Sequence, residues 1–154
     1  MSRIYKTVRI DDKTKFMIDK LISKYDNELG KNIKDLISKY EEELLLLEDF
    51  KNLSPQLTVK ISVSGIVEHA VKYFKIAEIP KEDIIKINYS NEDINKSSKN
   101  IKSNTLKLYL LDTTFDFIDD TKLFLSNILD ERLTTLKTIK IIISIYYKKE
   151  FNID

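Results

Sequence analysis

The sequence predicts a mainly α-helical protein with a short antiparallel β ribbon, built from two similar halves. Three observations predict this class. The stretches 3–11 and 105–110 alternate apolar and polar residues, as half-buried strands do. Each stretch leads into segments with apolar residues at helical spacing behind a capping residue. The 154 residues, 42% of them hydrophobic, can fill a core as one domain or as two small ones.

The first predicted strand has one apolar and one polar side. The apolar side consists of Ile4, Val8 and Ile10. The polar side consists of Tyr5, Thr7 and Arg9. Because successive side chains of a strand point to opposite faces, the apolar side needs a core, whereas the polar side is open to solvent or to a partner.

Two helices are predicted to follow this strand. Asp11 or Asp12 is a good N-cap for a helix over about residues 13–27, and Gly30 predicts its end. Asn32 can cap a second helix. The expected apolar faces are Phe16, Met17, Leu21, Ile22 and Tyr25 in the first helix, and Ile33, Leu36, Ile37, Tyr40, Leu44 and Leu47 in the second. The four leucines Leu44–Leu47 put apolar surface all round the axis, so an internal core, a second copy or a different protein must cover them.

A third helix is predicted beyond the loop at Ser54 and Pro55. Ser62 or Ser64 can cap it. Its buried face should be Ile66, Val67, Ala70, Val71 and Phe74, and it contains the single histidine, His69. Residues 79–104 are mostly polar and predict a long linker or mobile loop between two modules.

The last segment repeats the design of the first. Leu106, Leu108 and Leu110 alternate with Thr105, Lys107 and Tyr109. Asp112, Thr113 or Thr114 should cap a helix with Phe117, Ile118, Phe124, Leu125 and Ile128 on its apolar face. Thr134 or Thr135 should cap another, with Leu136, Ile139, Ile142, Ile143 and Tyr146 facing inward. A shift of 100 residues aligns the two strands, which is the pattern a duplicated module leaves.

Composition restricts the function. The chain has no cysteine, which excludes disulfides, zinc–thiolate sites and thiol nucleophiles, and its acids are scattered as on solvated helix faces. We therefore expect no catalytic residues, cofactor or metal. No apolar run reaches the roughly 18 residues of a membrane-spanning helix, and the N-terminus does not resemble a secretory signal, so we expect a cytoplasmic protein without membrane contact.

The net charge of +1 argues against nucleic acid binding, but the charges are unevenly distributed. Residues 1–24 carry seven Lys or Arg against three acids, and residues 27–50 carry three Lys against seven acids. A basic end therefore lies next to an acidic segment.

The unit of strand, helix and capped helix resembles the ribbon-helix-helix family, to which the Arc and Met repressors and plasmid copy-number and partition regulators belong. The residues 6–10 (KTVRI) look like the ribbon of the omega-type plasmid regulators, and residues 62–74 (SVSGIVEHAVKYF) look like the family's second helix. The resemblance implies two modules, 1–78 with a helical insertion at about 28–58, and 105–154.

In this family, two strands pair antiparallel in the major groove, and the amino end of the second helix binds a phosphate. The resemblance implies that the bases are read by Tyr5, Thr7, Arg9, Thr105, Lys107 and Tyr109. It implies phosphate contacts near Ser62, Val63, Ser64, Gly65, Thr134 and Thr135.

Two alternatives stay open. Either residues 28–58 are an insertion, or the Asn32 helix is the second helix of the first module and residues 57–78 are an extra element. Either the two strands pair within one chain, as a pseudo-dimer that reads asymmetric DNA, or each pairs with its twin in a homodimer.

The function expected from the resemblance is sequence-specific binding of double-stranded DNA. The family's range implies a repressor, a partition factor, or an accessory protein of conjugative transfer that acts with a relaxase, for which the Leu44–Leu47 arm would suit the protein partner. The rival is an interaction module, antitoxin-like or scaffold, that does not read DNA.

Overall fold

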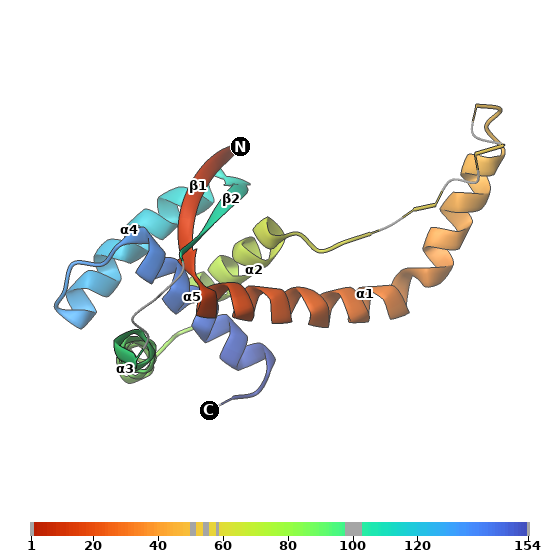
Figure 1. Cartoon of the computed structure of the whole chain (residues 1–154). Helices are drawn as coiled ribbons and strands as arrows, with labels where there is room; N and C mark the ends of the chain where they lie inside the picture. The colour runs from red at the N-terminus through yellow and green to blue at the C-terminus, as the bar shows by residue number, and fades with distance from the viewer. Residues whose placement is uncertain (1, 50–51, 54–55, 58, 98–102, 154) are drawn as a thin grey trace.

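The protein consists of five helices and one two-stranded antiparallel sheet in the residues that the computed structural model describes, 2–49, 52–53, 56–57, 59–97 and 103–153. The elements are β1 (Arg3–Asp11), α1 (Asp12–Leu45), α2 (Val63–Ile76), α3 (Lys81–Ser97), β2 (Ser103–Leu111), α4 (Asp112–Leu129) and α5 (Thr135–Glu150) (Figure 1). This confirms a mainly helical fold with a short ribbon. The loop predicted at Ser54 and Pro55 lies outside the described residues.

The ribbon is formed within one chain. β1 and β2 pair antiparallel from Arg3 opposite Leu111 to Asp11 opposite Ser103. Both strands, and the helices that follow them, begin 100 positions apart. Thr7 and Lys107 therefore occupy equivalent positions in the two halves, and they lie directly opposite each other. The approximate two-fold axis that relates the two strands passes through this pair.

Local capping chemistry sets where most of the helices begin. The Asp11 carboxylate accepts a hydrogen bond from the Thr14 amide at 2.8 Å, and Ser62 and Thr134 cap α2 and α5 in the same way, which confirms these three predicted caps. The predicted cap of α4 is wrong. Leu111 occupies that position without a side-chain hydrogen bond, and Asp112 instead accepts from the Thr113 amide inside the first turn.

The main core lies between the inner face of the ribbon and helices α1, α2, α4 and α5. Ile10, Leu108 and Leu110 of the ribbon are fully buried there. The predicted inner faces of α2 and α5 are buried apart from Phe74 and Leu136, which are partly covered. Two aromatic predictions are wrong, because Phe16 and Phe124 are about half exposed. Phe115, one turn from the start of α4, fills the core instead.

Residues 81–97 form helix α3, so the predicted linker over 79–104 is wrong for most of its length, although residues 98–102 lie outside the description. The helix is mostly polar, and among its described side chains two isoleucines face inward. Ile84 and Ile87 are buried in a smaller cluster with residues of α4, α5 and the turn between them. The cluster is completed by Leu125, Leu133, Ile141 and Ile145. This packing holds α3 on the body.

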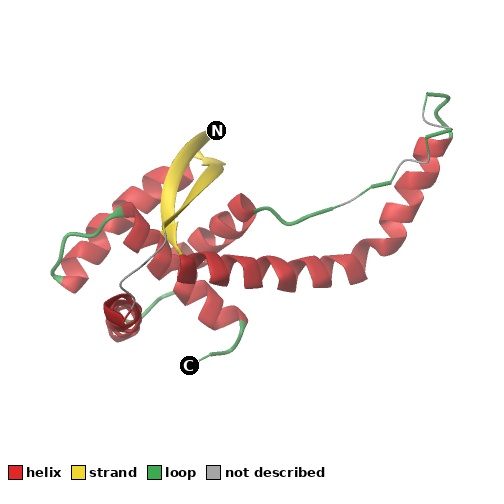
Figure 2. Ribbon diagram, viewed as in Figure 1, coloured by secondary structure: helices red, strands yellow, loops and turns green. Residues whose placement is uncertain are grey.

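Helix α1 is continuous through the predicted break at Gly30 and the predicted cap at Asn32, so both predictions are wrong. Its first half packs on the core, and its second half leaves the body (Figure 2). Residues 28–45 are therefore an extension of α1, which we call the arm helix. They are not a separate inserted helix. Helix α2, by contrast, lies in the main core and contributes Ile66 and Val67 to it.

Replacing Gly30 with alanine is expected to stabilise the protein. Gly30 has helical geometry without a positive φ, and a methyl group there would meet no other described heavy atom within 4 Å. The substitution should raise the free energy of unfolding by about 1 kcal/mol, because glycine loses the most backbone entropy in a helix. Urea unfolding followed by circular dichroism measures it. Ser23→Ala, at an exposed position of α1, is the control and should gain about half as much. A destabilised Gly30→Ala protein would contradict this expectation and would show that α1 needs glycine at this position.

Candidate nucleic-acid interface

Along the middle of the ribbon, the outer face presents six exposed side chains in three cross-strand pairs. The pairs are Tyr5 with Tyr109, Thr7 with Lys107, and Arg9 with Thr105. These are the six residues that the sequence placed on the polar sides of the two strands. The inner face of the ribbon is supported by the core, so the outer face is held by a rigid scaffold.

One end of this face is aromatic. The rings of Tyr5 and Tyr109 stack with centroids 4.3 Å apart and planes inclined by 22°. The Lys107 ammonium lies 4.6 Å from the centre of the Tyr5 ring, and the Arg3 guanidinium lies 5.9 Å from that of Tyr109. Arg3 also donates to the Tyr109 carbonyl oxygen at 3.3 Å. Each ring of the stacked pair therefore has a cation within 6 Å of its centre.

The other end is open and polar. Arg9 is exposed and makes no hydrogen bond or ion pair with any described residue, so its five donors stay available. Its cross-strand neighbour Thr105 is exposed as well. Since the approximate two-fold axis passes between Thr7 and Lys107, it relates the arginine end to the aromatic end. The two ends of the face are therefore chemically different.

Two buried polar contacts fix the ribbon on the helices, and each joins one half of the chain to the other. Lys140 of α5 donates to Asp11, the last residue of β1, at 2.5 Å. Glu68 of α2 accepts from the amide of Leu111, the last residue of β2, at 2.9 Å, and from the Thr114 hydroxyl at 3.1 Å. Glu68 and Lys140 each lie six residues after the N-cap of their helix. The two halves thus fix the ribbon from equivalent helix positions, with an acidic residue in α2 and a basic residue in α5.

Asp11 is almost fully buried, and its ionised form is stabilised. Burial raises the pKa of the carboxyl group. The hydrogen bond from Lys140 and two from the Thr14 amide and hydroxyl outweigh burial, so the pKa of Asp11 lies below its ordinary value. The carboxylate therefore stays charged at neutral pH while it caps α1 and anchors α5 to the end of the ribbon.

The amino ends of α2 and α5 both lie beside the ribbon. Ser62 accepts from the Gly65 amide at 2.9 Å, and Thr134 from the Lys137 amide at 3.2 Å. The Ser64 hydroxyl accepts from the Tyr109 amide at 2.9 Å, which attaches α2 to the edge of β2. The remaining first-turn amides of each helix lack an intrahelical acceptor, as at every helix start, and the positive end of the helix dipole lies there.

The start of α5 opens into a pocket of about 370 Å³ beneath β1. Its lining includes Lys6 and Arg9 of the strand and Thr134 and Thr135 of the helix. The Lys6 ammonium lies 4.8 Å above the ring of Phe115, which forms part of the wall. The Lys6 ammonium and a helix amino end thus meet at one hollow next to the exposed face of the ribbon.

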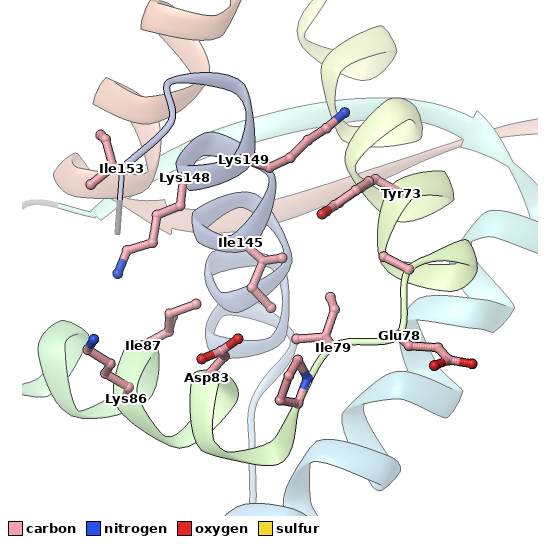
Figure 3. Close-up of a pocket in the computed structure, with 12 residues that line it drawn as sticks. Tyr73, Glu78, Ile79, Asp83, Lys86, Ile87, Ile145, Lys148, Lys149 and Ile153 are labelled. Carbon is pink, nitrogen blue, oxygen red and sulfur yellow. The ribbon is translucent and has the colours of Figure 1, made fainter.

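A second hollow, of about 540 Å³, lies near the carboxyl end of α5 (Figure 3). Isoleucines from α3 and α5 line it together with Asp83, Lys148 and Lys149. The Lys149 ammonium bonds to Glu150 at 2.9 Å and lies 4.8 Å from the Tyr73 ring. Because α5 is 16 residues, or about 24 Å, long, this hollow is separate from the ribbon face.

Sequence reasoning located the outer face of the ribbon but missed the residues that orient it. Lys140 interrupts a run of isoleucines and Glu68 follows Ile66 and Val67, and a charge inside an apolar helical face is the one signal that points to such a contact. Lys6 was also missed, because it lies on the apolar side of β1. Its charge becomes relevant only once the start of α5 is placed beside it.

No family model matches the sequence, and no curated protein or solved structure matches it. In the part of the chain that the structure describes, no helix has both the length and the apolar character needed to cross a membrane. Within the same residues, no cluster of three or more histidine or acidic side chains is arranged to hold a metal ion.

Proposed function

We propose that this protein binds double-stranded DNA sequence-specifically by placing its β ribbon in the major groove. One observation carries the proposal. The ribbon is the only sheet of the described chain, its inner face is packed on helices, and its outer face presents six hydrogen-bonding side chains in register. A two-stranded ribbon fits the major groove, where each base pair shows a distinct pattern of donors and acceptors.

Each side chain of the outer face has a chemical role in base reading. Arg9 bonds to no described residue, so it can donate to guanine O6 and N7 together, which is the commonest specific contact. Lys107 supplies a second donor at the centre of the ribbon, while Thr7 and Thr105 contact base edges or a thymine methyl group. The stacked Tyr5 and Tyr109 supply hydroxyl groups at the other end.

The helix amino ends beside the ribbon suit the two phosphate backbones. At α5, the amides near Thr134 and Thr135 would bind one phosphate. Lys6, which lines the same pocket below β1, would add its positive charge. At α2, the amides of Val63 and Ser64 take the equivalent role, while Gly65 and the Ser64 hydroxyl support the structure through their bonds to Ser62 and Tyr109.

The order of strand, helix and helix occurs twice in the chain, and with the sequence resemblance it supports assignment to the ribbon-helix-helix class. Residues 1–78 and 105–154 are then two modules that pair within one chain. Because the two ends of the face differ, the site read by one chain is asymmetric. On the same resemblance we propose a plasmid-encoded role in conjugative transfer, partition or repression.

The test uses the full chain and duplexes selected from a random pool, with affinity measured by fluorescence anisotropy over a range of salt concentrations. Arg9→Ala should weaken binding to the selected site by about 1–3 kcal/mol, and should reduce its preference over a scrambled duplex. Lys107→Ala should act in the same direction. Lys39→Ala, an exposed charge on the arm helix, is the matched control and should change neither quantity. Absence of binding at low salt, or a preference untouched by Arg9→Ala, would refute the proposal.

A second candidate is an interaction module that binds protein without reading DNA. The net charge of +1 and the exposed leucines at the tip of the arm favour it. In the transfer role, that tip would contact a relaxase. The two candidates separate in the same titration, because a pure interaction module shows no salt-dependent binding to duplex DNA.

A further inference from the structure

The arm helix carries an apolar stripe that the body of the protein does not cover. Ile33, Ile37, Tyr40 and Leu44 follow one another at intervals of four, three and four residues, which is the spacing of the two core positions of a heptad. None of them belongs to either buried cluster of the described residues: Tyr40 is 51% exposed, and Ile33, Ile37 and Leu44 are partly exposed. The stripe therefore has the pattern of a coiled-coil seam without a partner helix.

This helix also lacks favourable electrostatics at its end. Glu41, Glu42 and Glu43 lie in its last turns, where acids oppose the helix dipole, and no basic residue lies in the last turn. The returning chain adds two hydrogen bonds to α1: the Leu57 amide donates to the Glu41 carboxylate at 3.1 Å, and the Ile61 amide donates to the Asp26 carboxylate at 2.9 Å. These bonds leave the stripe partly open, so packing against another helix would stabilise the arm.

We propose that the arm helix pairs with the arm helix of a second copy of this chain, side by side and antiparallel. Ile37 and Leu44 occupy one of the two core positions of the heptad, and Ile33 and Tyr40 occupy the other. In an antiparallel pair, each residue of the first kind faces a residue of the second kind in the partner. Ile37 packs against the partner's Tyr40, Ile33 packs against the partner's Leu44, and the same contacts recur across the two-fold axis. The stripe is thus complementary to itself over its whole length, which a surface evolved for an unrelated protein has no need to be.

The flanking charges select the antiparallel orientation. Lys34 and Glu41 occupy equivalent flanking positions in successive heptads, and in the antiparallel pair Lys34 lies next to the partner's Glu41 at both ends of the seam. A parallel pair would instead bring the acidic ends of both arms together, with Glu41, Glu42 and Glu43 of one arm beside the same residues of the other. Antiparallel pairing puts the acidic end of each arm beside the lysine-bearing part of the other.

A charge-exchange experiment on the full chain, without DNA, tests this pairing by sedimentation equilibrium. The unmodified chain should dimerise. Lys34→Glu alone and Glu41→Lys alone should each raise the dimer dissociation constant by about tenfold, because two attractive contacts become two repulsive ones. Lys39→Glu makes the same charge change on the outer side of the arm helix and is the control, which should dimerise normally.

Mixing the two weakened variants gives the decisive result. In a mixed dimer both flanking contacts again join opposite charges, so equal amounts of Lys34→Glu and Glu41→Lys chains, one carrying a mass tag, should form heterodimers as tightly as the unmodified chain. Recovery on mixing also excludes misfolding, including any effect of losing the Leu57–Glu41 bond, as the cause of weak association. A monomeric unmodified chain, a dimer indifferent to both single changes, or a mixture that fails to recover would each overturn the proposal. The first outcome would assign the stripe to a different protein partner.

Discussion

Replacing Lys140 with methionine is expected to lower the free energy of unfolding by about 3–5 kcal/mol, because it leaves a charged Asp11 buried without its counter-ion. Both side chains are buried, at 4% exposure for Lys140 and 9% for Asp11. The Lys140 Nζ atom lies 2.5 Å from the Asp11 Oδ2 atom. Methionine keeps most of the length and apolar surface of lysine, so a packing defect contributes little. Urea unfolding at pH 7 measures the change.

The partner substitution identifies the cause. Asp11→Asn keeps an N-cap oxygen for the Thr14 amide but removes the negative charge. If the uncompensated charge dominates, Asp11→Asn combined with Lys140→Met should be more stable than Lys140→Met alone. A Lys140→Met protein that loses less than about 1 kcal/mol, or a double variant that is worse than the single one, would show that the pair contributes little.

Acid should reveal the same contact. The pKa of Asp11 is held below its ordinary value of about 3.9 by Lys140 and Thr14 against the opposing effect of burial. A carboxyl group with a lowered pKa in the folded state contributes stability at pH values above the unfolded pKa, and loses it as the pH falls through the folded one. The difference in stability between the unmodified chain and Lys140→Met should therefore be full at neutral pH and should narrow below about pH 4.

The predictable parts of the fold were those set by neighbouring residues. Asp11, Ser62 and Thr134 cap helices as predicted, because a cap bonds to an amide two or three residues away. The helix end predicted at Gly30 was wrong. A glycine inside a helix costs about 1 kcal/mol, which is too little to end a helix when the neighbouring residues favour helix formation. Helix α3 was missed because its polar composition hides the two isoleucines, Ile84 and Ile87, that hold it.

The outer face of the candidate site could be predicted, whereas its orientation could not. The alternation of apolar and polar residues along β1 is enough to place Thr7 and Arg9 on the face away from the core, whatever the rest of the chain does. The contacts that fix the ribbon join residues 129 positions apart in one case, Asp11 and Lys140, and 43 in the other, Leu111 and Glu68. The sequence marks Lys140 and Glu68 only as charges inside apolar helix faces, so the residues that they contact could be assigned only from the tertiary structure.

Glu68 offers the matching test in the other half of the chain. Glu68→Leu should lower the free energy of unfolding by about 3 kcal/mol, because it leaves the Leu111 amide and the Thr114 hydroxyl in a buried site without their acceptor. Arg3 also lies 3.8 Å from the carboxylate and would lose that attraction. Glu68→Gln keeps one acceptor oxygen at the same place and is the control, with an expected loss of about 1 kcal/mol.

The two contacts that fix the ribbon, at Asp11 and at Leu111, should respond differently to the loss of a charge, because their partners carry opposite charges at equivalent positions. At Asp11 a buried cation is bonded to a buried carboxylate, whereas at Leu111 the carboxylate of Glu68 accepts from neutral groups. Glu68→Gln should therefore be tolerated where Lys140→Met is not, since a neutral amide still accepts from the Leu111 amide. Equal losses for Glu68→Gln and Glu68→Leu would mean that the charge of Glu68, through Arg3, dominates at this contact. In that case both contacts would depend on an ion pair, Asp11 with Lys140 in one and Arg3 with Glu68 in the other.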